Sequence, residues 1–93
     1  MIALVLAGHE FADAASRFER ALALSRAVLA LEDDAASELE ANIREIGRST
    51  VLSTLEAAEH VASIARPGMS VGEATAALSR RAEVVRRSWP YRP

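Results

Sequence analysis

Residues 1–66 read MIALVLAGHEFADAASRFERALALSRAVLALEDDAASELEANIREIGRSTVLSTLEAAEHVASIAR. This stretch contains no proline, and its only glycines are Gly8 and Gly47. Apolar residues recur in it at steps of three and four, which is the spacing along one face of an α-helix. A second helical pattern follows the break at Pro67 and Gly68. The sequence therefore predicts an all-α protein.

Two helices are expected before that break. The first spans about 9–31, and the apolar run 1–7 could extend it backwards or form a short extended segment. Asp33 or Asp34 is expected to cap the second helix, which spans about 34–66 and is weakest at 47–50, where a kink is expected. The apolar face of the first helix carries Phe11, Ala15, Phe18, Leu22 and Leu29.

The third helix is expected over about 70–89. Ser70 and Glu73 have the spacing of a capping box, in which each side chain bonds the free backbone N–H of the other residue. Trp89 lies in phase with the apolar positions of this helix, just before Pro90. We expect its ring to pack against the second helix near residues 46–50.

Short connections between these helices predict an antiparallel three-helix arrangement with a long second helix. A 33-residue helix would be about 50 Å long, so the molecule is expected to be elongated. The third helix would reach only the middle of the second and leave apolar residues under-covered at the far end. This predicts an oligomer, or pairing with another helical protein, through Leu22, Leu24, Val28, Leu29, Leu31, Leu39 and Ile43.

The charged residues suggest a second interpretation. The segment 32–45 is acidic and the C-terminal helix is basic, so the antiparallel return is expected to bring the two together. The same arginines could instead hold an anion such as a nucleic-acid phosphate. The candidate anion-binding residues are Arg80, Arg81, Arg86 and Arg87. A net charge of −2 gives this nucleic-acid alternative no support from the molecule as a whole.

Catalytic and metal-binding patterns are not identifiable in the sequence. No nucleophile set or phosphate-binding glycine loop is found, and the chain has no cysteine. Glu56 and His60 are four residues apart on one helix face, but a metal site needs three or four ligands, so surface histidines are favoured. We therefore expect no enzyme activity, cofactor or metal.

Two features of the sequence resemble known enzymes. The segment Arg66-Pro67-Gly68-Met69-Ser70 locally resembles the methionine-aminopeptidase and prolidase family, but that family's acidic and histidine ligands have no counterparts here. A small all-helical dimeric enzyme, similar to chorismate mutases, is a remote alternative, because by pattern no arginine faces inward. The local resemblance implies no activity for this chain, and the small helical enzyme stays a remote alternative.

The composition indicates how the helices pack and where the protein is located. All eleven basic residues are arginine and alanine is abundant, which is typical of a GC-rich bacterial genome and favours close packing on small side chains. The apolar start lacks the basic region of a signal peptide, and no run approaches the ~20 apolar residues that span a bilayer. We expect a cytoplasmic protein without a membrane partner, acting as an adaptor, chaperone or assembly subunit.

Overall fold

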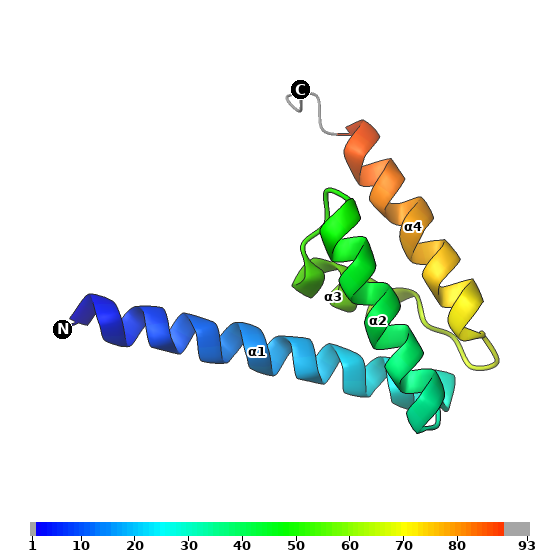
Figure 1. Cartoon of the computed structure of the whole chain (residues 1–93), viewed down its shortest axis with the longest axis horizontal. Coiled ribbons are helices and arrows are strands. Elements are labelled where there is room, and N and C mark those ends of the chain that lie inside the picture. Colours follow the sequence, from blue (N-terminus) through cyan, green and yellow to red (C-terminus); the bar gives the residue numbers. More distant parts are fainter. Residues whose placement is uncertain (1, 89–93) are drawn as a thin grey trace.

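The computed structural model describes the backbone of residues 2–88 and the side chains of residues 13–88. Within that part of the chain it has four helices and no strand, so the all-α prediction is confirmed (Figure 1). The expected packing of Trp89 lies outside the described residues. The helices are α1 (Ile2–Leu29), α2 (Asp33–Ser49), α3 (Thr54–Ile64) and α4 (Val71–Ser88). Residues 2–7 are thus helical and belong to α1.

The predicted second helix over 34–66 is wrong, because the chain forms two helices there. Thr50 adopts an extended backbone, and its Oγ1 donates to the Ile46 carbonyl at 2.8 Å. Ser53 then caps α3: its Oγ accepts from Glu56 N at 3.1 Å, and Glu56 Oε1 accepts from Ser53 N at 2.8 Å. The expected kink at 47–50 is a complete break, after which the chain folds back.

Helix α3 is the centre of the fold and packs against each of the other three helices. Its Ala57, Ala58 and Val61 are fully buried. On α1 the buried positions facing this core include Ala21 and Ser25, whose Oγ donates to the Ala21 carbonyl at 2.9 Å. Small side chains therefore let the helices approach closely, as the composition predicted.

The expected hairpin of the first two helices is also corrected. Helix α1 rests mainly on α3, which lies between α1 and α4. It meets α2 at a few points, including the Arg44 guanidinium, which lies 5.0 Å from the centre of the Phe18 ring. Ala15, expected on the buried face of α1, is exposed, whereas Ser25 is buried. The buried face is rotated because α3, not α2, covers it.

The turn after α1 explains how the chain reverses in so few residues. Leu31 N donates to the Arg26 carbonyl at 3.0 Å and Ala30 N to the Ala27 carbonyl at 3.3 Å, the two bonds of a Schellman motif. Helix α2 then begins at Asp33 with Glu32 at the N-cap, which makes no side-chain cap bond. The expectation that Asp33 or Asp34 caps α2 is therefore wrong.

Ala30 has φ 53°, a left-handed conformation that costs a residue with a Cβ about 1 kcal/mol. Replacing Ala30 with glycine should remove this strain. We expect Ala30→Gly to raise the free energy of unfolding by about 0.5–1 kcal/mol, measured by urea denaturation. Ala27→Gly, inside the same helix, is the matched control and should lower stability by about 1 kcal/mol. A loss of stability in Ala30→Gly would contradict the left-handed turn.

The connection from α3 to α4 follows the sequence prediction closely. Gly68 has φ 87°, which suits a residue without a Cβ. Ser70 Oγ accepts from Glu73 N at 3.0 Å, and Glu73 Oε1 accepts from Ser70 N at 3.1 Å, so the predicted capping box is confirmed. Asn42 Nδ2 donates to Thr75 Oγ1 at 3.0 Å and ties the start of α4 to the middle of α2.

The molecule is elongated. Its radius of gyration is 14.6 Å and its extents are 48 × 35 × 18 Å, whereas a compact chain of this length has a radius of gyration of about 12 Å. Figure 1 shows why: the N-terminal half of α1 extends away from the other three helices. No helix in the described part of the chain is long and apolar enough to cross a membrane.

Candidate protein-binding surface

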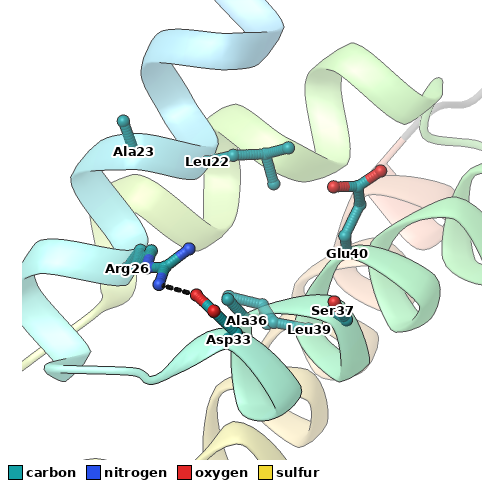
Figure 2. Close-up of a pocket in the computed structure, with 8 residues that line it drawn as sticks. All are labelled: Leu22, Ala23, Arg26, Asp33, Ala36, Ser37, Leu39 and Glu40. Atoms are coloured by element: carbon teal, nitrogen blue, oxygen red, sulfur yellow. Dashed lines mark hydrogen bonds and ion pairs between the residues drawn. The ribbon is translucent and has the colours of Figure 1, made fainter.

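Two grooves run along the C-terminal half of α1. The α1–α2 groove has a volume of about 380 Å³. Leu22 enters it from α1, Glu40 faces it from α2, and the ion pair of Arg26 with Asp33 lies at one end (Figure 2). Its lining residues are Leu22, Ala23, Arg26, Asp33, Ala36, Ser37, Leu39 and Glu40.

The α1–α3 groove lies on another side of α1 and has a volume of about 450 Å³. Leu24 is 53% exposed there, which makes it one of two large apolar side chains that stand open to solvent among residues 13–88. The lining residues are Arg17, Arg20, Ala21, Leu24, Glu59, Ala62 and Ser63. A groove with an apolar wall and charged rims suits another helix better than a small polar ligand.

Arg17 links the two helices that form this groove. Its Nη2 donates to Glu59 Oε1 at 2.7 Å and its Nε to Glu59 Oε2 at 3.2 Å. The hydrogen bond to Glu59 raises the pKa of Arg17, the charge of Glu59 adds to this, and Asp13 contributes a smaller charge effect. Among residues 13–88, the only hydrogen bond that Arg20 makes is to the Ser16 carbonyl, at 3.4 Å. Its charge is therefore available to a partner's carboxylate.

The structure divides the predicted partner interface. Leu29, Leu39 and Ile43 are buried within the chain, at 6%, 2% and 0% exposure, so in this fold they belong to the core. Leu22, Val28, Leu31 are half-buried against that core. Leu24 is the one exposed residue of the seven. The predicted interface of these seven residues stays a prediction. Sequence reasoning had not included Arg17, Arg20 or the exposed Val84, because charged residues and isolated apolar residues have no pattern that marks a binding surface.

The four candidate anion-binding arginines are mostly engaged within the chain. Arg81 Nη1 donates to Ser63 Oγ at 2.8 Å and lies 3.2 Å from His60 Nδ1. Arg86 and Arg87 both pair with Glu83. Arg80 is exposed and bonds no other described residue. An external anion would therefore have to displace existing bonds at three of the four positions.

The expected pairing of this basic end with the acidic segment 32–45 is wrong for the described residues. The acids of that segment pair locally, as Asp33 with Arg26, Glu40 with Arg44 and Glu45 with Arg48. The cause is the direction of α4: its C-terminal half lies beside residues 49–51, at the end of α2, instead of beside the acidic start of α2.

Glu83 gives a pH-dependent test of this local pairing. The hydrogen bond from Arg86 lowers the pKa of the Glu83 carboxyl from 4.5 to about 2, and Arg87 contributes in the same direction. A depressed folded-state pKa adds stability above the unfolded-state value, and this stability is lost as pH falls from about 4.5 towards 2. We expect carbon NMR titration to report the low pKa, and Arg86→Gln to raise it. Arg80→Gln, the matched control, should leave it unchanged; an ordinary pKa in the wild type would contradict the pairing.

Metal binding has no support in the described residues, where no group of three or more His, Cys, Asp or Glu side chains could hold an ion. Comparisons with known proteins add no assignment. No protein-family model matches the chain, and no curated protein or solved structure matches it.

Proposed function

We propose that this protein is a non-enzymatic helical interaction module that associates with a second copy of itself or with another helical chain. The observation that carries the proposal is the length of α1 relative to the helix on which it packs. Helix α1 has 28 residues, whereas its main support α3 has 11. At 1.5 Å per residue, these lengths are about 42 Å and about 16 Å. Much of α1 therefore extends beyond the helix on which it rests (Figure 1).

The part of α1 that extends beyond α3, here called the arm, would be more stable if a partner packed against it. Short isolated helices are marginal in water, because most helical stability in proteins comes from packing an apolar face. The extending part includes the apolar run Ile2-Ala3-Leu4-Val5-Leu6-Ala7. A partner helix that covers it would stabilise the arm and remove apolar surface from water. A small adaptor, chaperone or assembly subunit works through surfaces of this type, and a cytoplasmic location belongs to the same proposal.

Sedimentation velocity at micromolar concentration tests self-association directly. We expect an oligomer that dissociates on dilution, with helix content that falls as it dissociates. Affinity purification of the native protein followed by mass spectrometry tests for a different helical partner. A monomer that retains full helicity on dilution and captures no partner would reject the proposal.

The nucleic-acid alternative uses the arginines of α4. Its support is weaker, since Arg81, Arg86 and Arg87 already bond within the chain. Of the four arginines, Arg80 is the one without a bond to another described residue. Fluorescence anisotropy with labelled duplex and single-stranded DNA at low salt decides it. Salt-dependent binding that disappears when all four arginines are replaced by glutamine would favour this alternative.

A further inference from the structure

One face of α1 carries an ordered series of charges. Because α1 is a continuous helix, residues that follow each other at steps of four and three share a face. Along one such face the residue types run apolar, acidic, acidic, basic, basic, apolar. We call this series the charge stripe; its members are Leu6, Glu10, Asp13, Arg17, Arg20 and Leu24.

The charge stripe is complementary to itself when reversed. If two copies of α1 lie antiparallel with Ala15 at the centre, position 6 comes opposite 24, position 10 opposite 20, and position 13 opposite 17. Leucine then meets leucine and each acid meets an arginine. Two-fold symmetry makes every contact occur twice. A parallel pair in register would instead place acid on acid and arginine on arginine, which is unfavourable.

The C-terminal half of the charge stripe borders an open groove. Arg17, Arg20 and Leu24 line the α1–α3 groove, whose remaining wall includes the small residues Ala21 and Ala62. Leu24 is 53% exposed there, and Arg20 has no carboxylate partner among residues 13–88. The groove thus offers an apolar contact and an unpaired cation on the side of α1 that α3 leaves uncovered.

We propose that a second copy of this chain docks its α1 antiparallel into the α1–α3 groove. The acidic half of each stripe then reaches the basic half of the other, and Leu6 of the second copy covers Leu24. Over residues 6–24 the paired helices run for about 27 Å. The inference rests on the proposed self-association and explains how the extending arm of α1 is supported: each arm lies along the body of the other copy.

Charge reversal with complementation tests the docking. Arg17→Glu/Arg20→Glu makes the whole stripe acidic, and Glu10→Arg/Asp13→Arg makes it basic. Each variant alone should dimerise about tenfold to a hundredfold more weakly than the wild type in sedimentation equilibrium at low salt, because four ion pairs become repulsive. An equimolar mixture should recover the dimer as a heterodimer. Circular dichroism establishes that each variant is folded.

Two controls separate the stripe from general charge effects. Arg48→Glu/Arg80→Glu changes the net charge by the same amount as Arg17→Glu/Arg20→Glu, but on exposed residues of α2 and α4, and should dimerise as the wild type does. Glu59→Gln removes the carboxylate that holds Arg17 within the chain. It should leave dimerisation intact or strengthen it, since Arg17 then bonds Asp13 of the second copy without competition. Weakened dimerisation in Glu59→Gln would count against docking through Arg17.

Disulfide cross-linking gives the direction of the helices. The chain has no cysteine of its own. Leu6→Cys and Leu24→Cys variants should cross-link when mixed and oxidised, whereas Leu24→Cys alone should not. Two results would overturn the antiparallel docking while leaving self-association in place. One is cross-linking of Leu24→Cys alone, and the other is that both charge-reversal variants dimerise as strongly as the wild type. A strictly monomeric wild type would overturn the docking and restrict the proposed function to a different helical partner.

Discussion

Replacing Gly47 with alanine is expected to destabilise the protein by about 1–3 kcal/mol, although the same change inside an ordinary helix stabilises it. A Cβ at Gly47 would lie 2.8 Å from both the Cα and the N of Thr54. These are backbone atoms, so they cannot turn aside as a side chain can. For a domain of this size the melting temperature should fall by about 4–8 °C per kcal/mol, measured by circular dichroism.

Gly72 provides the matched control. It lies in the first turn of α4, and the nearest atom to an added Cβ is Ser70 Oγ at 3.8 Å. Gly72→Ala should therefore be neutral or stabilise by up to about 1 kcal/mol. If Gly47→Ala melts at or above the wild-type temperature, α2 and α3 do not cross closely, and the continuous 34–66 helix becomes the better description.

The break between α2 and α3 shows why the sequence predicted the helical class correctly but not the number of helices. Apolar positions keep the same helical phase across the break, since Leu39, Ile43 and Ile46 before it and Ala57 and Val61 after it are all buried. Both helices face the same core, so periodicity alone cannot separate one helix of 33 residues from two that fold back. The helix class was therefore predictable from periodicity, whereas the number of helices was not.

A local signal of that break was present. Ser53 and Glu56 have the same spacing as Ser70 and Glu73, and both pairs form capping boxes. The second pair follows Pro67 and Gly68, which make a helix start obvious. The first follows no proline, and the information that decides the break is the approach of Gly47 to Thr54, a tertiary contact. Contacts of this kind are set by the whole fold and cannot be read from local pattern.

The candidate surface was predictable to a smaller extent. The expectation of an under-covered leucine end assumed that only two helices meet there, but α3 folds back beside α1 and shields Leu29, while Leu39 and Ile43 lie in the same core. Leu24 stays exposed because it lines the open α1–α3 groove, together with Ala62 of α3. Which leucines stay exposed thus depends on where α3 lies. That position follows from the break between α2 and α3, which the sequence predicted only as a kink.

A large loss of stability is expected when a core residue of the predicted interface is truncated. Ile43 is fully buried in the core, at 0% exposure. Truncating such a side chain to alanine removes its burial and leaves a cavity, so Ile43→Ala should lower the free energy of unfolding by about 2–5 kcal/mol. Small domains have stabilities near the lower end of about 5–15 kcal/mol, so this variant should be largely unfolded at moderate urea concentration. Urea denaturation followed by circular dichroism measures the loss.

Leu24 is the matched comparison, because it was predicted to belong to the same interface but is 53% exposed. Leu24→Ala should change the stability of the dilute monomer by about 0.5 kcal/mol or less, as surface substitutions do. Its effect should fall on association instead, since the antiparallel docking covers Leu24 twice in each dimer. Equal stability losses in the two variants would place Leu24 in the core; unchanged association in Leu24→Ala would mean that the α1–α3 groove is not where the second copy binds.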